Sequence, residues 1–81
     1  MIMSGPQKDS TGKTFFDVCG VARVTVIPKT YNGSPGVRIQ AYKGAGQAMH
    51  SGAEIPIPDK EAAYDFLAEM ARAMLKLYPA K

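Results

Sequence analysis

Four basic side chains and the only histidine share a stretch of the chain that contains no acidic residue. Asp17 and Glu54 bound this stretch. The residues inside it that carry or can gain a positive charge are Arg23, Lys29, Arg38, Lys43 and His50. Residues 18–53 therefore carry +4, whereas residues 1–17 are neutral and residues 54–81 carry −1. Such a concentration of positive charge attracts polyanions before any specific contact forms.

The other reactive side chains do not match a catalytic or metal-binding pattern. Cys19 and His50 are the only cysteine and histidine, and a metal site needs several such ligands close together. Nothing around His50 resembles the strand–turn–helix element that presents a catalytic serine. We therefore expect no enzyme activity, no metal and no cofactor. Cys19 is expected to pack in the core as a small apolar residue.

Size and composition predict one small domain. The chain has 81 residues, of which 46% are hydrophobic, as in ordinary globular proteins. Residues 1–12 contain Gly5, Pro6 and Gly12 and show no periodicity, so we expect a flexible segment before a single domain at residues 13–81. No apolar run approaches the roughly 20 residues of a membrane span. We expect a cytoplasmic protein that does not enter the membrane.

Residue patterns in the first two thirds of the chain predict three or four strands. Aromatic and β-branched residues dominate residues 13–28, and Gly20 interrupts them, so this stretch is one bent strand or two strands. A dense cluster of turn-forming residues follows. Further strands are expected at residues 37–43 and 53–57. Pro56 lacks an amide donor, which places the last strand at an edge of the sheet.

The last third of the chain predicts one helix. Asp59 is a suitable N-cap, residues 60–77 are rich in good helix formers, and Pro79 ends the pattern. Acidic residues precede basic ones, in agreement with the helix dipole. The fold class is thus α+β, with a three- to four-stranded antiparallel sheet followed by one C-terminal helix packed on one face.

Strand alternation assigns the polar residues of the middle strands to the face opposite the helix. Guanidinium and ammonium groups hold phosphates, and tyrosines such as Tyr31 and Tyr42 stack on bases. The residues expected to contact nucleic acid are Arg23, Thr25, Lys29, Tyr31, Arg38, Gln40, Tyr42, Lys43 and His50. The alternative is an ordinary solvated sheet face, which often carries the same residue types.

The predicted helix has an apolar stripe about twice as wide as one small sheet can cover. A homodimer would bury the surplus flank. The expected interface residues are Tyr64, Leu67, Ala71, Leu75 and Tyr78. The alternative is that alanine, a good helix former, simply tolerates exposure here, which explains Ala71 better than Leu75.

Residues 36–74 resemble a superfamily of single-stranded-DNA-binding proteins. The similarity lies in the alternating apolar, basic and aromatic residues of 37–43, a Gly-containing loop, a short strand and a helix opened by Pro58 and Asp59. The superfamily includes the transcriptional positive coactivators, the Whirly proteins and the purine-rich-element-binding proteins. The resemblance implies a curved four-stranded antiparallel sheet followed by a helix. The chain lacks the lysines that coactivator-type members often carry before the last strand.

These observations favour a small, non-enzymatic, homodimeric protein that binds single-stranded DNA or RNA. About four phosphates neutralised per protomer would give a slope near −3 for log affinity against log salt. The alternative is a protein-interaction module, such as a small accessory or inhibitor protein, whose basic face docks on an acidic protein surface.

Overall fold

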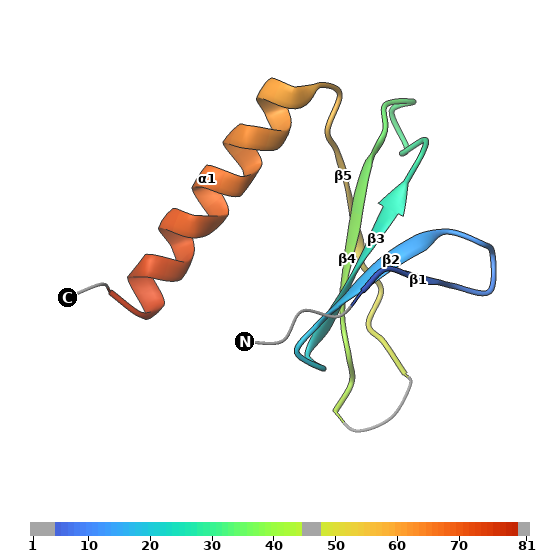
Figure 1. Cartoon of the computed structure of the whole chain (residues 1–81), viewed down its shortest axis with the longest axis horizontal. Coiled ribbons are helices and arrows are strands. Elements are labelled where there is room, and N and C mark those ends of the chain that lie inside the picture. Colours follow the sequence, from blue (N-terminus) through green and yellow to red (C-terminus); the bar gives the residue numbers. More distant parts are fainter. Residues whose placement is uncertain (1–4, 45–47, 80–81) are drawn as a thin grey trace.

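The structure, a computed structural model, describes residues 5–44 and 48–79. A five-stranded antiparallel sheet is followed by one C-terminal helix (Figure 1). The strands, which also lie in this order in the sheet, are β1 (Gln7–Lys8), β2 (Thr14–Val18), β3 (Ala22–Ile27), β4 (Gly36–Ala41) and β5 (Ala53–Pro56); the helix is α1 (Lys60–Leu77). The predicted α+β class and element order are confirmed, and the sheet has one strand more than expected.

The additional strand, β1, lies in the segment that was expected to be flexible. Gln7 pairs with Phe15 of β2, and the turn between the two strands is organised by Asp9. One Asp9 carboxylate oxygen accepts hydrogen bonds from the backbone amides of Thr11 and Lys13, both at 2.9 Å. A strand of two residues has no periodicity, which is why sequence patterns missed it. Residues 1–4 of the same segment lie outside the described residues.

Gly20 lies in the tight turn that separates β2 from β3. Cys19 and Gly20 both have positive φ, 49° and 72°, and the Val21 amide donates to the Val18 carbonyl at 2.9 Å. These features define a hairpin turn whose twist matches that of the flanking strands. Cys19 is exposed at its tip. The prediction that Cys19 packs in the core is wrong, because a turn residue points away from both faces of the sheet.

Strand pairing confirms the predicted alternation of faces. One row across the sheet, on the side of α1, contains Phe16, Val24, Ile39 and Ala53. The adjacent row, on the opposite side, contains Phe15, Thr25, Arg38 and Glu54. The last strand, β5, is at an edge, as Pro56 predicted.

The best-packed part of the molecule is the end of the sheet where β3 joins β4. Ile27, Thr30 and Gly36 are buried there. The Thr30 amide donates to the Ser34 carbonyl at 2.7 Å, which folds the β3–β4 loop back on itself. Gly36 is close to the Ile55 carbonyl and to Thr30, so a β-carbon at this position would clash with both.

α1 begins and ends as its sequence predicts, but it packs only loosely. The Asp59 carboxylate accepts from the Ala62 amide at 2.8 Å, and the Tyr78 amide donates to the Met74 carbonyl before Pro79. No residue of α1 is buried. The helix diverges from the sheet toward its C-terminus (Figure 1). No helix among the described residues has the length and hydropathy needed to cross a membrane.

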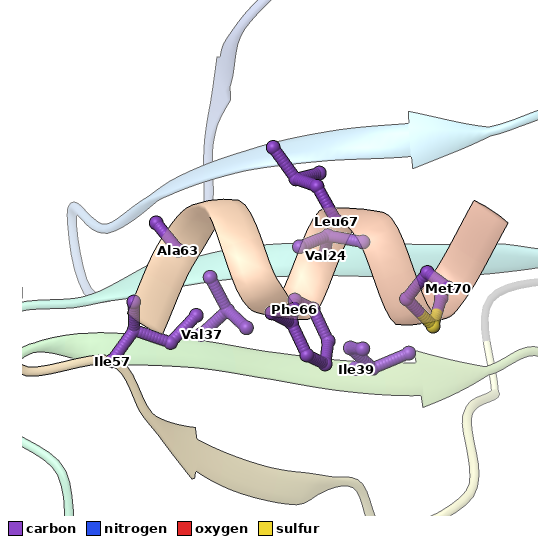
Figure 2. A pocket seen from close by; sticks show the side chains of 8 residues that line it. All are labelled: Val24, Val37, Ile39, Ile57, Ala63, Phe66, Leu67 and Met70. Carbon is purple, nitrogen blue, oxygen red and sulfur yellow. The ribbon is translucent and has the colours of Figure 1, made fainter. Parts of the chain in front are cut away.

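A groove of about 360 Å³ separates α1 from the apolar face of the sheet. Its walls come from both layers and are entirely apolar: Val24, Val37, Ile39, Ile57, Ala63, Phe66, Leu67 and Met70. Figure 2 shows the side chains of the first half of α1 facing strands β3 and β4 across this space. The helix therefore lies on the expected side of the sheet without closing onto it.

Candidate nucleic-acid interface

The two central arginines lie on the face opposite α1, as predicted, and are two positions apart in the strand register. Arg38 pairs with Thr25 across β3 and β4, whereas Arg23 pairs with Gln40. We call the end formed by the β3–β4 loop and the start of β4 the Arg38 end. The Arg23 end comprises the β2–β3 turn and the residues that follow β4. The surroundings of the two guanidinium groups differ.

Arg38 is electrostatically compensated. Its Nη2 lies 2.9 Å from Oε2 of Glu54, and both side chains are about two-thirds buried or more, at 33% and 26% exposed. The other Glu54 oxygen accepts from the Tyr31 amide at 3.0 Å. Glu54 lies just outside the acid-free stretch of the sequence, yet the strand register sets it directly opposite Arg38. Arg38, which the sequence predicted to contact nucleic acid, therefore already has a carboxylate partner within the protein.

Arg23 has aromatic neighbours instead of a carboxylate. Its guanidinium carbon lies 3.7 Å from the centroid of the Phe15 ring and 6.0 Å from that of Tyr42. These contacts are cation–π interactions, which hold the guanidinium without neutralising its charge. Among the described residues, no carboxylate lies within ion-pairing distance of Arg23, and its buried Nε has no hydrogen-bond partner. A buried donor without a hydrogen-bond partner lowers the stability of the fold.

The nearest acid to Arg23 is already engaged. Asp17 is its direct cross-strand neighbour on β2. One Asp17 oxygen accepts from the Tyr42 hydroxyl at 3.0 Å, and the other accepts from the Gly20 amide at 2.8 Å. Asp17 thus fixes the Tyr42 ring and the β2–β3 turn. Its charge still reduces the local field, so the Arg23 end is less basic than the sequence segment suggested.

Three other predicted contacts lie with Arg23 and Tyr42 at the Arg23 end. Gln40 donates through Nε2 to the His50 carbonyl at 3.4 Å, and the His50 amide donates to Ala41 at 2.9 Å. The Lys43 and His50 side chains are exposed. Five of the nine predicted residues are therefore grouped here: Arg23, Gln40, Tyr42, Lys43 and His50.

The remaining predicted contacts do not join this group. Lys29 and Tyr31 are exposed in the β3–β4 loop at the Arg38 end. Four steps along β4, of about 3.3 Å each, place Gly36 at this end about 13 Å from Gln40, the cross-strand partner of Arg23. Thr25 is only 2% exposed, so its predicted role as a surface contact is wrong. Phe15, which supports Arg23, was not predicted, because only the strand register reveals that contact.

The predicted dimer residues are exposed; four of them lie on α1, and Tyr78 is its C-cap. Tyr64, Leu67 and Leu75 are 67%, 63% and 52% exposed, and Tyr78 is 81% exposed. Ala71 is exposed among them. Among the described residues, no group of three or more histidine, cysteine or acidic side chains could hold a metal ion.

Comparison with protein-family models, with curated proteins and with solved structures finds no match to this chain. The resemblance to the single-stranded-DNA-binding superfamily stays a prediction.

Proposed function

We propose that this chain binds single-stranded nucleic acid at the Arg23 end and performs no catalysis. The observation that carries the proposal is the environment of Arg23: its guanidinium rests on the Phe15 ring beside Tyr42, and no carboxylate of the described residues pairs with it. A phosphate oxygen would accept from the Nη groups of Arg23, because charge-assisted hydrogen bonds are the strongest that a guanidinium makes. Arg38 is excluded from this role by Glu54.

The neighbouring residues complete a plausible chemistry for a flexible strand. Lys43 is exposed and can contact a second phosphate. His50, also exposed, adds charge when it is protonated. Tyr42 and the outer plane of Arg23 offer flat surfaces for unpaired bases. Stacking needs bases that are not already paired, which favours single strands over duplexes.

The alternative is a basic surface that docks on an acidic protein. The same cations serve both partners, but base stacking on Tyr42 and Arg23 serves only nucleic acid. The proposal therefore requires oligonucleotides to bind better than a polyanion without bases, such as heparin of similar charge. Equal binding of both would favour the acidic-protein alternative.

The direct test is a salt titration with a fluorescently labelled single-stranded oligonucleotide. Two to three phosphate contacts per protomer should give a slope of about −1.5 to −2 for log affinity against log salt. This is shallower than the slope near −3 expected from the sequence, because Arg38 no longer counts. Absence of binding at about 50 mM salt would overturn the proposal.

A matched pair of variants locates the site. Arg23→Met removes one positive charge but keeps an apolar side chain over Phe15, and Lys29→Met removes one positive charge at the Arg38 end. We expect about a tenfold loss of affinity for Arg23→Met, a slope shallower by about 0.7, and less than a twofold loss for Lys29→Met. Circular dichroism checks that both fold. Equal losses would show that only net charge matters and would contradict a site at Arg23.

A further inference from the structure

Gln40 lies next to both groups that offer a flat surface to a base. It is the direct cross-strand partner of Arg23, and Tyr42 follows it two residues later on the same face of the sheet. The β-carbons of directly paired residues lie about 5 Å apart, and those of residues two apart on one strand about 7 Å. A base stacked on Tyr42 or on the outer plane of Arg23 therefore has its edge within reach of the Gln40 amide.

A backbone carbonyl holds the Gln40 amide in one orientation. Its Nε2 donates to the His50 carbonyl at 3.4 Å, and the His50 amide in turn donates to the Ala41 carbonyl at 2.9 Å. A carbonyl only accepts hydrogen bonds, so the nitrogen of the Gln40 amide, and not its oxygen, faces His50. The contact therefore determines which end of the amide is engaged within the protein.

Gly52 restricts the Gln40 side chain further. A β-carbon at position 52 would clash with Cγ of Gln40 and with the Ile39 carbonyl oxygen. Glycine lets the backbone of residues 50–52 lie this close to β4 because it has no side chain. Both the stem and the nitrogen of Gln40 thus contact the segment that leads into β5, which keeps the amide in place before a ligand binds.

The other end of the amide, Oε1, is an acceptor without a donor. Within residues 5–44 and 48–79, no group donates a hydrogen bond to it. Gln40 is half-buried, yet the polar atom of such side chains that is both enclosed and unpaired in these ranges is Nε of Arg23, so Oε1 is open to solvent. The site therefore offers one fixed, accessible acceptor beside its two flat surfaces.

A single acceptor distinguishes bases by the groups on their edges. Adenine and cytosine each present an exocyclic amino group, which can donate to Oε1 of Gln40. Uracil and thymine have a carbonyl group at the corresponding position of the ring, and two facing oxygens repel each other. Their N3–H lies between two carbonyl groups, so an acceptor that approaches it meets both oxygens. Adenine and cytosine therefore fit the Gln40 acceptor better than uracil and thymine do.

We propose that Gln40 determines base specificity at the Arg23 end, which selects single strands containing cytosine or adenine over those containing uracil or thymine. This inference rests on the proposed function, because it names the bases that the same site prefers. Phosphate contacts of Arg23 and Lys43 provide affinity for any strand, since phosphates carry no sequence information. The Gln40 amide adds the discrimination.

Fluorescently labelled oligo(dC) and oligo(dU) of equal length test the selectivity. The two strands have the same backbone and the same ring size, so they differ mainly in the hydrogen-bonding groups of the base. The unchanged chain should bind oligo(dC) about fivefold to tenfold more tightly, as one hydrogen bond between neutral groups provides. Equal affinities would overturn the selectivity and leave the proposed function standing. Absence of binding to either strand would overturn both.

Gln40→Met separates base recognition from phosphate binding. Methionine keeps the length and the apolar stem of glutamine but has no amide, so affinity for oligo(dC) should fall to that for oligo(dU). The salt slope should stay unchanged, because no charge is lost. Gln7→Met makes the same change on exposed β1 and should keep the preference. Circular dichroism checks that both variants fold. A preference that survives Gln40→Met would assign it to another group and overturn the proposal.

Discussion

The Arg38 end and the Arg23 end are built from the same strands, yet their construction is opposite. At the Arg38 end, buried Ile27, Thr30 and Gly36 hold a folded-back loop, and Glu54 pairs with the arginine. At the Arg23 end, the turn residue Cys19 is exposed and has positive φ. At the Arg38 end the arginine has an ion-pair partner, whereas at the Arg23 end no carboxylate of the described residues forms an ion pair with the arginine. The Arg38 end thus stabilises the fold, whereas the Arg23 end is available for a ligand.

The difference arises from strand register rather than composition. Asp17 and Glu54 are the two acids that bound the acid-free stretch, and pairing sets each of them opposite one of the arginines. Glu54 forms an ion pair with Arg38, whereas Asp17 accepts hydrogen bonds from the Tyr42 hydroxyl and the Gly20 amide. Local charge counting along the chain therefore overestimates the basic character of the folded surface.

Glu54→Gln should leave Arg38, like Arg23, without an ion-pair partner. Of the substitutions of acidic residues considered, it should change oligonucleotide affinity the most. The substitution removes the charge that compensates Arg38 but keeps an oxygen that can accept from the Tyr31 amide. Arg38 becomes available to a phosphate, so affinity for a single-stranded oligonucleotide should rise several-fold and the salt slope should steepen by about 0.7. The loss of a partly exposed ion pair should cost at most about 1 kcal/mol of stability.

Glu61→Gln is the matched control for that change in net charge. Glu61 is exposed in the first turn of α1, away from the arginine-bearing face of the sheet. Its removal should change affinity much less than Glu54→Gln does. An equal gain for both variants would indicate a non-specific effect of net charge. No gain for Glu54→Gln would show that Arg38 cannot contact the ligand even when it is unpaired.

The sequence predicted the elements well because each depends on local patterns. The alternation of Val24 and Ile39 against Arg23 and Arg38 assigned the two faces correctly, and Asp59 located the start of α1. These signals span only a few residues. They depend on sheet pleating and helix capping, which operate without knowledge of distant parts of the chain.

Sequence patterns did not predict the contacts between segments that are distant in the chain. The ion pair of Arg38 with Glu54 joins residues 16 positions apart, and the bond from Tyr42 to Asp17 joins residues 25 positions apart. Either contact requires the register of neighbouring strands, which alternation alone does not define. Burial of Thr25 likewise follows from the packing around it and not from its own type.

Cys19→Asn should stabilise the turn at the Arg23 end without changing the charge there. A β-carbon in the left-handed region costs roughly 1–2 kcal/mol, and asparagine tolerates this region better than most residues do. Asparagine followed by glycine is also the preferred pair for this hairpin turn. We expect the free energy of unfolding in urea to rise by about 1 kcal/mol, with oligonucleotide affinity unchanged. Cys19→Ala removes the same thiol and should give no such gain; a gain in both would assign the effect to the thiol.

Asp9, in the β1–β2 turn, offers the smallest effect and a distinct dependence on pH. Its hydrogen bonds, first from the Thr11 side chain and then from the Lys13 amide, lower the pKa of the carboxyl below its usual 3.8. Because the folded-state pKa is the lower one, the stabilisation is present above about pH 3.8 and is lost as the pH falls through the folded-state pKa. A nuclear magnetic resonance titration of the Thr11 and Lys13 amides should therefore give a midpoint below 3.8. Asp9→Asn, which keeps an acceptor oxygen but cannot titrate, should abolish that transition and leave the resonances of the Arg23 end unchanged. A midpoint at or above the usual value would mean that the carboxylate does not organise the turn.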